Sequence, residues 1–347
     1  MAARAFICGL KTSGLSEKEG DFLRRCEPWG IILFPRNVKS LEQVGELCRR
    51  IRRTLGREDA PILIDQEGGR VQRIRPPHVR AYPPVATYGA MYAENPLLAV
   101  EAARLGAKLL ALDLSALGIN VDCAPVLDVP SPDADGIVGD RAFGADTDVV
   151  LTLGGAQIDG FFAGGVLPVM KHIPGHGRAN VDSHKALPRV DASLAELEAV
   201  DFAPFRLWAS KVPLAMTAHV VYTAIDPDTV ATHSKIVIES IIRERIGFRG
   251  LLMSDDLSMG ALSGDLASRA AASIAAGCDV VLHCSGELKP GEAIARSVPE
   301  LEGDALRRAN EALAMLMPPE PVDRVALEAR FDALLARFAT RPEAATA

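Results

Sequence analysis

The chain has 347 residues, 48% of them hydrophobic and 24% charged, and a formal net charge of −7. This balance is typical of a globular protein with a substantial core, and the negative charge argues against sequence-independent nucleic-acid binding, which needs a basic face. Six cysteines are scattered without a C-x-x-C pair, which disfavours a disulfide-stapled secreted fold and favours a reducing compartment.

The N-terminal residues lack an apolar stretch long enough for a signal peptide. The apolar stretch 151–170 contains Gln157, Asp159, Pro168 and five glycines, so a helix followed by a buried strand explains it better than a membrane span does. We therefore expect a cytoplasmic protein that binds neither nucleic acid nor a membrane.

Short apolar runs recur along the chain and alternate with amphipathic helical patterns. Runs that are apolar on both faces are typical of strands in a parallel sheet covered by helices. The eight strands predicted in this way are 5–10, 30–34, 61–65, 119–126, 167–172, 213–219, 251–256 and 279–284. Between the second and third of them, Ser40 and Gln43 stand in capping-box spacing before a helical pattern that ends at Gly56. Ser193 and Glu196 stand in the same capping-box spacing after the fifth predicted strand.

Eight strands that alternate with helices predict an α/β fold, a single-domain TIM-type (β/α)8 barrel. A doubly wound open sheet is the alternative, because the number of strands does not prove that the sheet closes. We expect residues 1–347 to form one catalytic domain, since no linker or low-complexity tract divides them. Residues 300–338 are predicted to be helices packed outside the barrel, with a turn at 317–323 and frayed residues after them.

In a barrel, the loops that follow the strands meet at one face, where catalysis takes place. Polar residues follow several of the predicted strands: Asp65, Asp128, Lys171 with His172, His219, and Asp255 with Asp256. We therefore expect the functional site at this face.

The most informative stretch is KHIPGHGRANVDSHKALP, residues 171–188, which predicts a long loop of the kind that is often functional. Three interpretations compete for it. Its histidines could simply be solvated, or His172 and His176 could bind zinc together with Asp182 or His184. The interpretation we favour is a catalytic His184 held by Asp182. A nearby carboxylate fixes the imidazole tautomer and raises its basicity, which suits a group that donates and then accepts a proton.

The segment LLMSDDLSMGAL, residues 251–262, places two aspartates at the exit of a buried strand. A carboxylate held rigidly there suits a nucleophile. Either aspartate could instead cap the helix that follows, and one could be catalytic while its neighbour is structural.

Two further segments carry candidate binding residues. In LIDQEGGRVQRI, Asp65 ends a strand, and Arg70 and Arg73 follow a glycine pair. The segment could equally be an ordinary turn, and no nucleotide-binding pattern accompanies it. In GDRAFGAD, Arg141 could bind hydroxyls or an anion, or it could only pair with nearby aspartates.

Together these segments resemble glycoside hydrolase family 3, specifically its single-domain bacterial β-N-acetylglucosaminidases of peptidoglycan recycling. The matching segments, in the family's order, are IDQEGGRVQR (64–73), GDRAFG (139–144), KHIPGHG with DSH (171–184) and SDDLSM (254–259). Ile173 stands where the family often has an aromatic residue, a mild departure. The resemblance spans most of the chain and implies a TIM-type barrel and a retaining, two-step mechanism that needs no metal or organic cofactor.

The resemblance also implies the roles of individual residues. Asp255 matches the nucleophile, a choice over Asp256 that depends on the family's motif, while His184 matches the acid/base and Asp182 its partner. The residues that match the N-acetylglucosamine-binding set are Asp65, Arg73, Arg141, Lys171 and His172.

The activity implied is that of an exo-β-N-acetylglucosaminidase acting on small amino-sugar or muropeptide substrates. A phosphorylase remains an alternative, because a histidine acid/base lets an anionic phosphate approach the glycosyl intermediate. A sugar-binding sensor without turnover is another, and the intact catalytic set argues against it. The sequence leaves the oligomeric state open and is compatible with a monomer.

Overall fold

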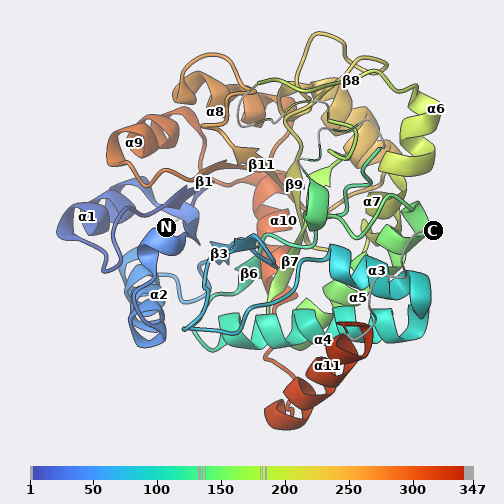
Figure 1. The fold of residues 1–347 in the computed structure, drawn as a ribbon. Helices are drawn as coiled ribbons and strands as arrows, with labels where there is room; N and C mark the ends of the chain where they lie inside the picture. The colour runs from blue at the N-terminus through green and yellow to red at the C-terminus, as the bar shows by residue number, and fades with distance from the viewer. Residues whose placement is uncertain are drawn as a thin grey trace.

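The computed structural model describes residues 3–131, 134, 136, 138–179, 181, 183 and 186–339. At its centre is a closed barrel of eight parallel strands in the order β1-β12-β11-β9-β7-β6-β3-β2 (Figure 1). The strands are β1 (Arg4–Gly9), β2 (Pro28–Leu33), β3 (Ile62–Ile64), β6 (Val121–Asp122), β7 (Leu167–Ile173), β9 (Leu214–Thr217), β11 (Leu251–Asp256) and β12 (Val280–His283). The predicted (β/α)8 barrel is therefore confirmed, and the open-sheet alternative is wrong.

Each barrel strand falls within or overlaps one of the predicted apolar runs, and the strand interiors are buried. The fourth strand is much shorter than predicted: β6 covers only Val121–Asp122 of residues 119–126. Pro125 lacks the N–H that a continued ladder would need. Pairing resumes at an isolated bridge between Val126 and Lys171, so this stretch still lines the barrel.

Helices surround the barrel and cover the outer faces of its strands (Figure 1). They are α1 (Glu17–Cys26), α2 (Leu41–Leu55), α3 (Ala86–Glu94), α4 (Pro96–Ser115), α5 (Thr147–Ala163), α6 (Leu194–Glu196), α7 (Ala203–Trp208), α8 (Leu266–Ala276) and α9 (Leu288–Ser297). The 3₁₀-helical turns are η1 (Pro35–Asn37), η2 (Gly139–Arg141) and η4 (Ala231–His233), and the π-helical segments are η3 (Leu197–Asp201) and η5 (Val237–Arg245). Two small sheets outside the barrel pair β4 (Gln66–Gly68) with β5 (Val71–Gln72), and β8 (Arg189–Val190) with β10 (Val221–Tyr222).

The predicted capping signals differ in how fully they form. The Ser193 hydroxyl accepts from the Glu196 N–H, and the Glu196 carboxylate accepts from the Ser193 N–H, so this box is complete. At α2 the Ser40 hydroxyl accepts from the Gln43 N–H, but the Gln43 side chain accepts from the N–H of Lys39 instead. The second bond of a capping box, which would come from the N–H of Ser40, is therefore replaced by a bond from the N–H of the preceding residue, Lys39.

After α9 the chain forms two further helices, α10 (Gly303–Ala314) and α11 (Arg324–Ala339). Residues 317–323 between them are non-helical. Figure 1 shows α11 lying against α4, and the buried Phe331 is at this contact, facing Gly106. None of the helices in the described part of the chain has both the length and the apolar character to cross a membrane.

Candidate active site

Charged side chains from three parts of the barrel form one connected network at its mouth. The Lys171 Nζ, near the end of β7, lies 3.0 Å from Asp65 Oδ1 and 2.7 Å from Glu67 Oε1. Asp65 follows β3 and also accepts from Arg73 Nη2 at 3.0 Å. Glu67, in β4, accepts two hydrogen bonds from Arg141, at 2.8 and 2.7 Å. The charges therefore alternate along the chain of contacts, and cations stand at both ends.

The network keeps its charges although it is buried. Burial alone would raise the pKa of Asp65 and Glu67, but Lys171 and the arginine beside each carboxylate hold both pKa values below their usual range, that of Glu67 at about 2. Burial alone would lower the pKa of Lys171, and the two carboxylates raise it instead. The carboxylates and the ammonium are therefore ionised at neutral pH.

Parts of the network remain open to a ligand. The side chains of Asp65, Arg73 and Arg141 are 15%, 26% and 18% exposed, whereas Lys171 is 2% exposed. Among the residues that the structure describes, the buried Nε of Arg73 has no hydrogen-bond partner. Ionised donors and acceptors in fixed positions suit a small ligand that is rich in hydroxyl groups.

His172 is held by a carboxylate beside this network. Its Nδ1 lies 2.7 Å from Asp128 Oδ2, and Asp128 Oδ1 accepts from the backbone N–H groups of His172 and His176 at 3.1 and 2.7 Å. Burial alone would raise the pKa of Asp128, but His172 and these hydrogen bonds hold it at about 2. Because a carboxylate only accepts, we assign the proton to Nδ1 of His172. Asp128, which the sequence places at a strand end without an evident role, here orients His172.

The first part of the loop after β7 is packed tightly against the barrel. Gly177 accepts from the N–H of Ser131 at 3.1 Å, and a Cβ at Gly177 would lie 2.0 Å from the Val129 carbonyl oxygen. Arg178 Nε donates to Asp201 Oδ2 at 2.7 Å. This part of the loop therefore has little space in which to move.

Two residues predicted to be catalytic, Asp182 and His184, lie outside the described residues, so their dyad stays a prediction. His176 is described and buried, and burial, followed by the neighbouring His172, lowers its pKa to about 4. Within the described ranges, no group of three or more His, Cys, Asp or Glu residues is placed to hold a metal ion. The zinc interpretation, which needed Asp182 or His184 as a ligand, is therefore not tested.

The structure distinguishes the two aspartates at the end of β11 by their hydrogen bonds. Asp256 accepts from the N–H groups of Ser258 and Cys284, both at 3.1 Å, and from the Ser258 hydroxyl at 2.5 Å. Within the described part of the chain, the Asp255 carboxylate accepts only from the N–H of Asp256, at 2.7 Å. Asp256 thus holds the loop that follows the strand, while Asp255 is left with an uncommitted oxygen.

Asp255 lies across the barrel from Asp65. In the closed strand order, three strands separate β11 from β3 on either side, whereas only β9 separates β11 from β7, which carries Lys171. Burial raises the pKa of the Cys123 thiol, and the negative charges of Asp65 and Asp255 raise it further. Cys123 is therefore close enough to both carboxylates to be affected by their charges.

Glu67 is the member of this site that sequence reasoning missed. It stands two positions after Asp65, which places both side chains on the same side of an extended segment, and that spacing could have identified it. Arg70, which follows the glycine pair, instead pairs with Asp140 at 2.8 Å, with both side chains about half exposed.

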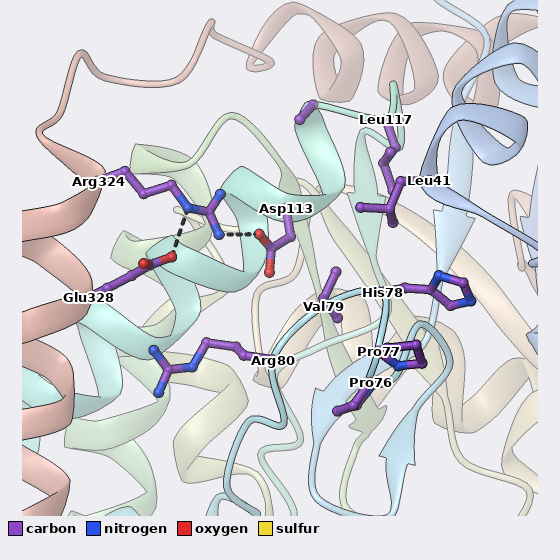
Figure 2. Close-up of a pocket in the computed structure, with 11 residues that line it drawn as sticks. Leu41, Pro76, Pro77, His78, Val79, Arg80, Asp113, Leu117, Arg324 and Glu328 are labelled. Atoms are coloured by element: carbon purple, nitrogen blue, oxygen red, sulfur yellow. Dashed lines mark hydrogen bonds and ion pairs between the residues drawn. The ribbon is translucent and has the colours of Figure 1, made fainter.

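A hollow of about 500 Å³ lies on the outer surface, between the end of α4, residues 76–80 and α11 (Figure 2). Figure 2 shows Arg324 bonded to both Asp113 and Glu328. The side chains of Arg324 and Glu328 are 44% and 37% exposed. The charged groups on this side of the hollow thus satisfy one another at the surface.

Comparisons with known proteins agree with this geometry. The model of the glycosyl hydrolase family 3 N-terminal domain matches residues 15–314. A β-hexosaminidase of Xanthomonas oryzae pv. oryzae is 38% identical over 311 residues, covering 88% of this chain and 89% of the relative. One of Pseudomonas aeruginosa is 40% identical over 273 residues, covering 78% and 79%.

Among solved structures, native NagZ from Neisseria gonorrhoeae superposes with a TM-score of 0.85 and 32% identity, covering 97% of both chains. The same protein in complex with N-trifluoroacetyl-D-glucosamine gives a TM-score of 0.85 and covers 98% of both chains. Both similarities extend over nearly the whole length of this chain.

Proposed function

The chain belongs to glycosyl hydrolase family 3 and is a glycoside hydrolase of the β-hexosaminidase type, and on this premise we propose that it is a retaining exo-β-N-acetylglucosaminidase. Its substrates are peptidoglycan-derived fragments that end in N-acetylglucosamine. The observation that carries the proposal is the Asp255 carboxylate, which keeps one oxygen without a hydrogen bond among the described residues and follows a strand of the same barrel whose mouth holds the buried Asp65–Lys171–Glu67 network.

The reaction proceeds in two steps. Asp255 attacks the anomeric carbon and forms a covalent glycosyl-enzyme, while His184, paired with Asp182, protonates the departing oxygen. Water then attacks the same carbon while His184 takes its proton, and the bond to Asp255 breaks, which releases the sugar and restores the carboxylate. A histidine in place of the usual second carboxylate puts less negative charge near the anomeric carbon.

The sugar ring is held by residues that follow β3 and β6 and by residues on β7. Asp65, Arg73, Arg141, Lys171 and His172 bind its hydroxyl and N-acetyl groups, and their fixed positions orient the ring for attack. Glu67 supports two of them, because it bonds both Arg141 and Lys171. The similar Neisseria protein forms a complex with N-trifluoroacetyl-D-glucosamine, which supports an N-acylated amino sugar as the ligand.

We further propose that the enzyme works as a monomer in the cytoplasm, within this one domain and without a cofactor. All six cysteines are free thiols, which fits a reducing compartment. Activity that persists in the presence of a chelator is the expected result, and its loss would favour the metal-dependent alternative.

The proposal is tested with 4-nitrophenyl N-acetyl-β-D-glucosaminide. We expect the wild-type protein to release nitrophenol and to give the β-anomer of N-acetylglucosamine first, as proton NMR of the fresh product would show. Asp255→Ala should lower kcat by at least about 10⁴-fold, because no other group would form the covalent intermediate. Binding of N-acetylglucosamine without turnover by the wild type would instead indicate a sensor. Formation of N-acetylglucosamine 1-phosphate in phosphate buffer would indicate a phosphorylase.

The role of His184 is tested through the leaving group. His184→Ala should lower kcat/KM much more for a disaccharide than for the nitrophenyl glycoside, because nitrophenolate departs without full protonation. Rates with a series of aryl glycosides would measure this dependence. Equal losses on both kinds of substrate would contradict an acid/base role.

A further inference from the structure

His219 lies just beyond the end of β9, beside the strand that carries Asp255. Its side chain is fully buried, and β9 and β11 are neighbours in the barrel. Its Nε2 lies 3.2 Å from the main-chain carbonyl oxygen of Asp256, and its Nδ1 lies 2.7 Å from the hydroxyl oxygen of Thr232. Both ring nitrogens are therefore engaged.

These partners fix the tautomer of His219. A carbonyl oxygen only accepts hydrogen bonds, so Nε2 must carry a proton. Burial lowers the pKa of His219, although the negative charge of Asp255 opposes that effect, so the ring is neutral near pH 7 and Nδ1 accepts. The Thr232 hydroxyl then donates to Nδ1 at 2.7 Å, a shorter contact than its 3.2 Å to the Ala218 carbonyl oxygen, and can accept from the hydroxyl of Thr217, 2.8 Å away.

The carbonyl that His219 binds belongs to the residue that orients the Asp255 carboxylate. The N–H of Asp256 donates to Asp255 Oδ1 at 2.7 Å. Asp256 is thus held at its carbonyl by His219 and at its carboxylate by Ser258 and Cys284. A shift of the Asp256 backbone would carry its N–H, and with it the Asp255 carboxylate, away from the sugar.

We propose that His219 is a positioning residue for the nucleophile, whose Nε2–H holds the Asp256 carbonyl so that the Asp256 N–H fixes the Asp255 carboxylate. This inference rests on the proposed role of Asp255. It separates two properties of the site, because no hydrogen bond among the described residues joins His219 or the Asp256 carbonyl to a sugar-binding residue, although β7, which carries His172, pairs with β9. Loss of the His219 contact should therefore slow the covalent step and leave sugar binding intact.

The experiment compares His219→Leu with His219→Gln. Leucine removes the donor, whereas the amide nitrogen of glutamine can take the place of Nε2. Because a misplacement of about 1 Å can cost about 10²-fold in rate, we expect His219→Leu to lower kcat on the nitrophenyl glycoside about 10²-fold, and His219→Gln to stay within about tenfold of the wild type. The inhibition constant of N-acetylglucosamine should change less than about threefold in both, because sugar binding does not use this contact. His78→Leu, at a histidine of the outer hollow, is the matched control and should leave kcat unchanged.

Three results would overturn the proposal: an unchanged kcat in a folded His219→Leu variant, equal losses in the leucine and glutamine variants, or an inhibition constant that rises in parallel with the loss of kcat. If His219→Leu does not fold, ¹⁵N NMR of the wild-type imidazole decides, since a proton on Nδ1 would contradict the assigned contact. Absence of glycosidase activity in the wild type would refute the proposed function instead, and the NMR measurement would still test the contact.

Discussion

Two clusters of alternating charge in this protein have similar composition and different surroundings. At the barrel mouth, Lys171 lies between Asp65 and Glu67, and these side chains are 2%, 15% and 3% exposed. On the outer surface, Arg324 lies between Asp113 and Glu328 and is 44% exposed. The buried charges interact strongly, and removal of one leaves another unpaired. Water and salt screen the exposed pair of Arg324 and Glu328. The comparison teaches that burial determines whether a charge cluster controls stability and ligand binding.

The largest effect is expected at the centre of the inner cluster. Lys171→Met leaves two buried carboxylates, Asp65 and Glu67, each with only its own arginine as a partner. We therefore expect the free energy of unfolding to fall by about 3–5 kcal/mol. We also expect kcat/KM to fall by at least about 10²-fold, because the ring-binding groups lose their common partner. Urea unfolding and steady-state kinetics would measure both. Lys235→Met, at a 69% exposed lysine of a surface pair, is the control and should resemble the wild type.

An intermediate effect is expected from acid. The folded-state pKa values of Glu67 and Asp128 are depressed to about 2, so the unfolded chain binds more protons than the folded protein at low pH. Stability from these groups is present above their ordinary pKa values near 4 and should be lost as the pH falls from about 4 to about 2. Urea unfolding across this range would show the decline. Glu67→Gln should have a shallower decline than the wild type, and an equally steep one would break the assignment to the inner cluster.

The smallest effect is expected in the outer cluster. Glu328→Ala removes a 37% exposed partner of the 44% exposed Arg324, and solvent screens their interaction, so the free energy of unfolding should fall by less than about 1 kcal/mol. Turnover of the nitrophenyl glycoside should be unchanged. A loss comparable with that of Lys171→Met would show that burial is not the property that distinguishes the two clusters.

The fold could be predicted from the sequence because barrel strands are apolar on both faces. All eight runs were identified in this way, and Ser40, Gly56 and Ser193 marked helix ends correctly. Closure of the barrel depends on pairing between β1 and β12, the first and last strands, which no local pattern contains. The shortening of β6 at Pro125 was visible in the sequence, but the length of the apolar run outweighed it.

The site was only partly readable. Strand ends identified Asp65, Lys171 and Asp255 as individual residues, but not the contacts between them. The bond between Glu67 and Arg141 joins positions 74 residues apart, a contact that spacing cannot predict. Residue chemistry alone likewise left the aspartates at 255 and 256 equivalent; the family's motif favoured Asp255, and their hydrogen-bond partners now distinguish the two.

The tight packing of Gly177 against Val129, together with the bonds from Asp128 to the backbone of His176, has a consequence for redesign and divergence of this enzyme. No side chain larger than hydrogen fits at Gly177, and an inserted residue before it would displace both contacts from the barrel. Residues 174–177 therefore act as part of the scaffold, although they carry a loop sequence. Insertions and grafted segments within residues 174–177 should not be tolerated.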